Sequence, residues 1–194
     1  NPAAGIDLFD PQNARERYLS KEETQRLLKA IEGSENTQLK YIVPLLLLTG
    51  ARKREILDAT WDEVSVERKT LRVPLSKSGK PRLIPLSSAA LALLEKVPKF
   101  EGCPYVVPNP VTKKPYVGIY LSWHNARKKA GLPEVRMHDL RHSYASSLVN
   151  AGTSIYVVSK VLGHSQIKNT MRYSHLSQET LLDAAEKAAQ ALGV

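Results

Sequence analysis

The chain has 194 residues, of which 42% are hydrophobic and 24% are charged, the balance of an ordinary globular protein. This length supports one sizeable core without disulfides or metals, and the single cysteine, Cys103, excludes an internal disulfide and fits a reducing, cytoplasmic setting. The formal charge of +9 favours a polyanionic partner, and the excess lies in short clusters at 52–54, 77–82, 113–114 and 127–129.

The first half of the chain predicts three helices. Residues 1–18 show no clear period and are expected to be a linker arm. Ser20 and Glu23 form a capping box that starts a helix, which Gly33 ends. A second, almost wholly apolar helix is expected from about 37 to 49, and Arg52 opens a short third helix. The apolar run 42–48 is too short to cross a bilayer, and no signal segment opens the chain.

Strand patterns follow, and then more helices. Residues 70–73 and 82–86 are short extended runs that flank a turn at 76–80, so a small antiparallel hairpin is predicted there. A helix is expected from 88 to about 95, and five prolines make 96–115 a long loop with a short strand at 105–107. Further helices are expected near 118–130, 138–150, 154–162 and 177–192. The predicted fold class is therefore mainly α with one small antiparallel β-sheet.

Four short segments hold side chains that can carry charge around a phosphate. They are 49–55 (Thr-Gly-Ala-Arg-Lys-Arg-Glu), 76–80 (Ser-Lys-Ser-Gly-Lys), 138–142 (His-Asp-Leu-Arg-His) and 162–175, which holds Leu-Gly-His and Tyr-Ser-His. The candidate site residues are Arg52, Lys77, His138, Arg141, His164 and Tyr173. Guanidinium groups match the oxygens of a pentacoordinate phosphate, and a tyrosine hydroxyl can attack phosphorus. The combination predicts DNA strand cleavage by a tyrosine, with Glu55 pairing with Arg52 to fix its direction.

The order and local context of these residues resemble the tyrosine recombinase, or phage integrase, family. The family motif has an arginine after Thr-Gly, a lysine on a β-turn, His-x-x-Arg, Leu-Gly-His and a tyrosine nine residues later. All of these elements occur here in order between Thr49 and Tyr173. The resemblance implies the catalytic-core fold of that family and site-specific DNA recombination or integration for a phage or other mobile element.

The resemblance also implies a role for each residue. Tyr173 would form a 3′-phosphotyrosyl link, Arg52 and Arg141 would hold the phosphate oxygens, and His164 would donate a further hydrogen bond. His138 would take the tyrosine proton, and Lys77 would protonate the departing 5′-oxygen. No cofactor, metal or ATP is expected, because the phosphotyrosyl link conserves the bond energy.

Expected partners and domains follow from the same resemblance. Residues 1–18 would join a preceding DNA-binding domain to a catalytic domain at 19–194, whose helix at 177–192 docks on a neighbouring protomer. The partner would be double-stranded DNA and not a membrane, with a monomer in isolation and a tetramer on synapsed sites. Accessory DNA-bending or directionality proteins are further candidate partners.

Two other functions fit parts of the pattern. A type IB topoisomerase has a similar site and relaxes supercoils without exchanging strands. A DNA-binding protein that keeps the fold without catalysis is the third reading, and the complete set of six residues argues against it.

Overall fold

The computed structural model describes residues 17–74, 81–176 and 181–193. Its elements in chain order are α1 (Lys21–Glu32), α2 (Leu39–Thr49), α3 (Lys53–Leu57), the 3₁₀ turn η1 (Trp61–Glu63), β1 (Val64–Ser65), β2 (Thr70–Val73), β3 (Arg82–Pro85), α4 (Ser88–Glu95), α5 (Tyr120–Lys129), α6 (Asp139–Asn150), α7 (Ile155–Leu162), α8 (Lys168–Met171), the 3₁₀ turn η2 (Ser174–Leu176) and α9 (Leu181–Leu192). The predicted class, mainly helical with one small antiparallel sheet, is confirmed.

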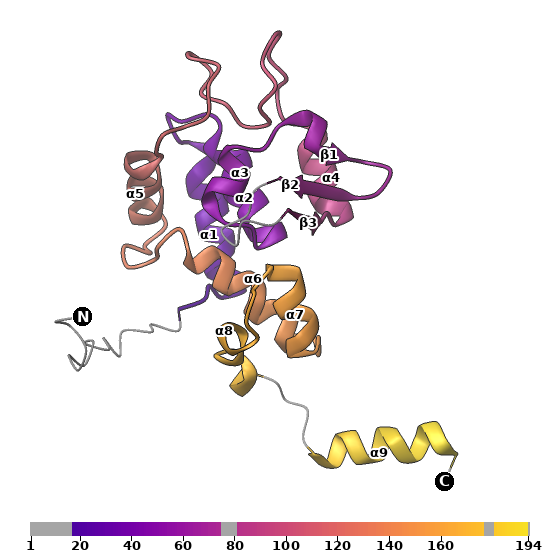
Figure 1. Cartoon of the computed structure of the whole chain (residues 1–194). Coiled ribbons are helices and arrows are strands. Elements are labelled where there is room, and N and C mark those ends of the chain that lie inside the picture. The colour runs from indigo at the N-terminus through magenta and orange to yellow at the C-terminus, as the bar shows by residue number, and fades with distance from the viewer. Residues whose placement is uncertain (1–16, 75–80, 177–180, 194) are drawn as a thin grey trace, which may run out of the picture.

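Helix α2 lies at the centre of the main body and packs against α1, α4 and α6 (Figure 1). Its sequence is almost entirely apolar, and Leu39, Ile42, Val43 and Leu46 are buried. Burial of each such side chain stabilises the fold by roughly 1.5–3 kcal/mol. The central helix therefore gives a firm position to the residues that follow its C-terminal end.

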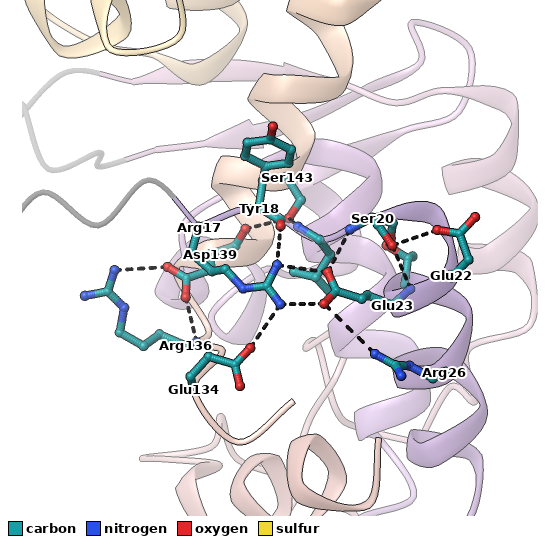
Figure 2. Close-up of polar contacts among 12 residues, drawn as sticks. Arg17, Tyr18, Ser20, Glu22, Glu23, Arg26, Glu134, Arg136, Asp139 and Ser143 are labelled. Carbon is teal, nitrogen blue, oxygen red and sulfur yellow. Dashed lines mark hydrogen bonds and ion pairs between the residues drawn. The ribbon is translucent and has the colours of Figure 1, made fainter. Parts of the chain in front are cut away.

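The segment before α1 is fastened to the core (Figure 2). Ser20 and Glu23 form the predicted capping box, and Arg17 forks onto the same Glu23 carboxylate at 2.9 and 2.6 Å. The backbone N–H of Leu19 donates to Ser143 Oγ of α6 at 2.8 Å. These bonds tie residues 17–20 to both α1 and α6. The predicted arm at 1–18 otherwise lies outside the described residues.

The sheet has the order β1-β2-β3, with every pair antiparallel. Leu71 of β2 pairs with Val64 on one side and Ile84 on the other. Leu71 and Val73 are buried while Arg72 between them is exposed, which is the alternation expected of a strand with one face on a core. The predicted turn at 76–80, with Lys77, lies outside the described residues.

Helices α6, α7 and α8 lie below the sheet and the α1–α4 group in Figure 1. They share a smaller hydrophobic cluster made by Ala145, Val149, Val158, Leu162 and Tyr173. Helix α9 stands apart from the other elements in the same view. Among the described residues, no helix is both long and apolar enough to span a membrane.

The predicted elements differ from the observed ones mainly where elements are short. The strand expected at 105–107 is reduced to a single bridge between Thr60 and Tyr105, because the prolines of this loop remove backbone donors. The elements β1, η1, α8 and η2 were not predicted. The helix expected at 118–130 begins at Tyr120, and the described part of the C-terminal helix begins at Leu181.

Candidate active site

The end of α2 and the start of α3 place the first candidate residue. Gly50 ends α2 in the left-handed conformation, with φ of 59°. A Cβ at Gly50 would lie 2.3 Å from Cδ1 of Tyr144, so both the backbone conformation and the packing require glycine. The chain then turns into α3, for which Arg52 is the N-terminal cap residue.

Glu55 holds Arg52 as the sequence predicted. One carboxylate oxygen of Glu55 accepts from the Arg52 backbone N–H at 2.7 Å, and the other accepts from Arg52 Nη1 at 2.8 Å. Arg82 of β3 donates to the same two oxygens at 3.2 and 2.7 Å. Burial alone would raise the pKa of Glu55, but the hydrogen bonds from Arg82 and Arg52 lower it below its ordinary value. Glu55 is therefore a carboxylate at neutral pH.

The start of helix α6 places His138, the residue before its first turn, and Arg141 within that turn. Arg141 is 3% exposed, and it donates to the backbone oxygens of Gly50 at 2.6 Å and Leu162 at 2.7 Å. Burial, followed by the charges of Arg52 and Arg82, lowers the pKa of Arg141 to about 10. Because its partners in these bonds are neutral carbonyls, its positive charge is left for an anion to balance.

Tyr173 lies against α6. Its side chain is 6% exposed, and its hydroxyl is in hydrogen-bond contact with Nδ1 of His142. The ring of His138 meets the ring of His142 edge-on, with centroids 4.8 Å apart. Burial, and then the neighbouring His138, lowers the pKa of His142 to about 4, and burial with the Arg141 charge lowers that of His138. Both imidazoles are neutral at pH 7.

His164 comes from the turn after α7. Gly163 ends that helix in the left-handed conformation, with φ of 67°. Nδ1 of His164 lies 2.8 Å from the hydroxyl of the buried Thr170 on α8. Burial, with the charges of Arg141 and Arg52, lowers the pKa of His164 to about 4. His164 is thus a neutral hydrogen-bonding group next to two cations.

These side chains surround a cavity of about 400 Å³. Its charged and titratable lining consists of Arg52, Arg141, Arg172, His138, His142 and His164. None of the described residues that line it is acidic. An anion with several oxygens could accept hydrogen bonds from the arginines and from a histidine at once.

The model of the phage integrase family matches residues 17–180, which is most of the chain. This chain belongs to the phage integrase family. It is 30% identical to the integrase of Salmonella phage P22 over 201 residues, covering 97% of this chain and 51% of that protein. It is 32% identical to the integrase of Haemophilus phage HP1 over 189 residues, covering 96% of this chain and 51% of that protein. The chain thus spans about half the length of these curated relatives.

Solved structures agree with this membership. The catalytic domain of the bacteriophage HP1 integrase superposes with a TM-score of 0.71 at 31% identity, over 90% of this chain and 96% of that domain. The XerH site-specific recombinase, bound to its palindromic difH substrate in a post-cleavage complex, superposes with a TM-score of 0.67 at 19% identity, over 92% of this chain and 53% of that one. The second likeness concerns the fold alone.

Within this phage integrase fold, four of the six predicted residues line one cavity: Arg52, His138, Arg141 and His164. Tyr173 does not line that cavity but contacts His142, which does, while Lys77 is outside the described residues.

Four further residues of this region had no role predicted from the sequence: His142, Arg82, Thr170 and Arg172. His142 could have been found from its spacing, because it is four residues after His138 on the same helix face. Arg82 was noted only as part of a basic cluster, and its link to Glu55 depends on tertiary contacts.

Proposed function

We propose that this chain is the catalytic part of a site-specific DNA recombinase that cleaves a strand with Tyr173 and rejoins it to a new partner. One observation carries the proposal: a cavity lined by three arginines and three histidines lies beside a buried tyrosine whose hydroxyl contacts one of those histidines. Membership of the phage integrase family supports it, as does the XerH relative solved on its DNA substrate.

In the proposed reaction, Arg52 and Arg141 hold the non-bridging oxygens of the scissile phosphate. Positive charge placed before the reaction stabilises the additional negative charge of the pentacoordinate state. His164 donates one further hydrogen bond. Tyr173 Oη forms a bond to phosphorus while the bond to the 5′-oxygen breaks, which leaves a 3′-phosphotyrosyl link and a free 5′-hydroxyl. Since the phosphoester bond is exchanged and not hydrolysed, rejoining needs no ATP.

Two proton transfers complete the reaction. Tyr173 loses its proton to a histidine, and His142 is in direct contact with its hydroxyl, with His138 beside His142. The resemblance points to His138 for this step, and the contact adds His142 as a second candidate acceptor. Lys77 supplies the proton to the departing 5′-oxygen. Because Tyr173 does not line the cavity, the proposed attack requires Tyr173, alone or together with His142, to move toward the bound phosphate.

The proposed partner is double-stranded DNA. A second hollow of about 760 Å³ adjoins the site, and its lining holds the cations Arg52, Lys53, Arg54 and Arg72 together with the carboxylates Glu55, Asp58 and Glu63. Arg52 and Arg54 are ion-paired with Glu55 and Asp58. The exposed Lys53 and Arg72 lie outside the ion pairs of the described residues, and in this proposal they contact the phosphates next to the scissile one. The remaining expectations also belong to this proposal: a preceding DNA-binding domain joined through residues 1–18, action in the cytoplasm, a tetramer on synapsed sites with α9 docked on a neighbour, and accessory DNA-bending or directionality proteins.

The deciding experiment is covalent capture on a DNA duplex nicked near the scissile phosphate, with EDTA present. We expect a protein–DNA adduct with the wild-type chain and none with Tyr173→Phe, while DNA binding is unchanged. Tyr156→Phe is the matched control, because Tyr156 is an exposed tyrosine on α7. An adduct that persists in Tyr173→Phe would move the nucleophile elsewhere, with Tyr144 tested next.

The same substrate separates the other two functions. Transfer of the captured strand to a different duplex identifies a recombinase. Capture followed only by resealing of the same strand identifies a topoisomerase. Binding without any capture identifies a DNA-binding protein, and capture that needs added magnesium contradicts the metal-free mechanism.

A further inference from the structure

Arg82 is a largely buried arginine that links three parts of the site. Its side chain is 11% exposed and extends from β3. Nε and Nη2 fork onto the two carboxylate oxygens of Glu55 in α3, at 3.2 and 2.7 Å. Nη1 donates to the backbone oxygen of Val161 near the end of α7, at 3.1 Å.

The carboxylate of Glu55 is shared between two arginines. Arg82 takes it with two guanidinium nitrogens, whereas Arg52 reaches it with a backbone N–H and with one guanidinium nitrogen. One negative charge therefore faces two positive charges, and the group retains a net positive charge. In the part of the chain that the structure describes, Arg52 donates only to Glu55, so its remaining guanidinium donors are available to a ligand in the cavity that it lines.

If Arg82 were absent, both carboxylate oxygens of Glu55 would be free to accept a forked pair of hydrogen bonds from the guanidinium of Arg52, the cap residue of the same helix. Forked arginine–carboxylate pairs are the preferred arrangement of these two groups. Arg52 would then be drawn onto Glu55 and its charge balanced there, so less of it would be available to an anion in the cavity.

The second arm of Arg82 reaches the turn that carries His164. Its guanidinium packs so closely on Gly163 that a Cβ at that glycine would lie 2.7 Å from Nη1. Val161, which accepts the Nη1 hydrogen bond, is three residues before His164. Arg82 thus holds this turn at a fixed place relative to α3.

We propose that Arg82 is a positioning residue, which occupies Glu55 so that Arg52 faces the cavity and which fixes the turn that presents His164. The identification of the cavity anion as a DNA phosphate rests on the proposed function above. The positioning by Arg82 should affect the binding of any tetrahedral oxyanion in the cavity, including inorganic phosphate.

The first test uses inorganic phosphate and needs no DNA. We expect Arg82→Gln to weaken phosphate binding by about 10-fold or more, which corresponds to about 1.4 kcal/mol. Arg82→Lys should be intermediate, because one ammonium cannot fork onto Glu55 and also reach Val161. The double variant Glu55→Gln/Arg82→Gln should bind phosphate at least about threefold more tightly than Arg82→Gln, because Glu55 no longer balances the charge of Arg52. It should remain weaker than wild type, because the turn that presents His164 is still not held by Arg82.

A merely structural role predicts a different pattern, because the double variant would then bind phosphate no better than Arg82→Gln. That result, or unchanged affinity in Arg82→Gln, overturns the proposal. If Arg82→Gln does not fold, as judged by circular dichroism, Arg82→Lys carries the test, and Arg82→Lys binding as tightly as wild type overturns it.

The second test measures capture on the nicked duplex at saturating and subsaturating DNA. At saturating DNA, we expect Arg82→Gln to slow capture by about 10²-fold, the loss that removal of one hydrogen-bond donor to a transition state causes. The affinity for DNA should change by less than about threefold, because the other phosphate contacts remain. Arg26→Gln is the control, because it removes an equal charge from an exposed position on α1 and should change neither quantity. Equal losses in both variants overturn the proposal. If the wild-type chain captures no DNA, the proposed function fails and the phosphate titration still decides this inference.

Discussion

In the contact between Tyr173 and His142, the pKa values of the two groups determine which of them holds the proton. A tyrosine hydroxyl ordinarily titrates near 10, whereas the pKa of His142 is lowered to about 4. The proton therefore stays on the tyrosine oxygen, which donates to Nδ1 of a neutral ring. Both groups are almost fully buried, so attack on a phosphate requires Tyr173 to leave this position or His142 to follow it.

Replacing His142 tests whether this contact serves catalysis. We expect His142→Phe, which keeps a ring of similar size, to slow covalent capture by about 10²-fold or more, as for loss of a general base. A general base must be unprotonated, and the pKa of His142 is lowered to about 4, so we expect the wild-type rate not to decline from pH 7 to about pH 5. A single-turnover pH profile of both proteins measures this. Wild-type speed in His142→Phe would assign the proton to His138.

At the residue scale, local motifs could predict side chains that the structure brings to one cavity, but not the contacts that hold them there. Arg52, His138, Arg141 and His164 were predicted from local motifs, and they do line one cavity. Arg82 could not be assigned, because its contact with Glu55 joins residues 27 positions apart.

At the scale of elements, the junction of α2 and α3 depends on one glycine. Gly50→Ala would put a methyl group into the ring of Tyr144 and force a side chain into the left-handed region. We expect a loss of about 2–4 kcal/mol in the free energy of unfolding, measured by urea denaturation. Gly131→Ala is the control, since Gly131 has φ of 70° and no atom within 4 Å of the added carbon, and it should cost only about 1 kcal/mol. Equal losses of unfolding free energy in Gly50→Ala and Gly131→Ala would mean that the close packing of Gly50 against Tyr144 does not add to the cost of the substitution.

Long elements were predictable and short ones were not. The helices α1, α2, α6 and α7 carry their own signals, such as the capping box of Ser20 and Glu23 or the glycine after α7. The two-residue strand β1 exists only because β2 offers it a pairing edge, and α8 is a four-residue helix. Elements of two to four residues are too short to show the hydrophobic periodicity from which helices and strands are predicted.

For the whole molecule, the buried histidines predict acid sensitivity. The pKa values of His142 and His164 are lowered from 6.5 to about 4, so the unfolded chain binds protons more readily than the folded one. Their contribution to stability is complete above about pH 6.5 and is lost as the pH falls toward 4. Glu55, whose pKa is lowered from 4.5, keeps its contribution until the pH falls below about 4.5 and loses it progressively from there.

We expect the free energy of unfolding to fall by about 2–4 kcal/mol between pH 7 and pH 4, allowing for the partial exposure of His164. Urea titrations at pH 7, 5.5 and 4 measure this. His142→Phe should show a shallower decline, because it removes one of the titrating groups. Stability that stays level or rises on acidification would contradict the burial of neutral imidazoles.

The two hydrogen bonds of Arg141 have an evolutionary consequence. Both acceptors, at Gly50 and Leu162, are backbone oxygens, and every amino acid supplies one. Replacing Leu162 with another apolar residue of similar volume would leave its bond to Arg141 in place. The anchoring of this guanidinium therefore constrains the path of the chain, and at Leu162 it leaves the identity of the side chain free to vary, whereas Gly50 is constrained by its own backbone conformation and packing. A fold that recurs at 19% identity with a TM-score of 0.67 is compatible with such tolerance.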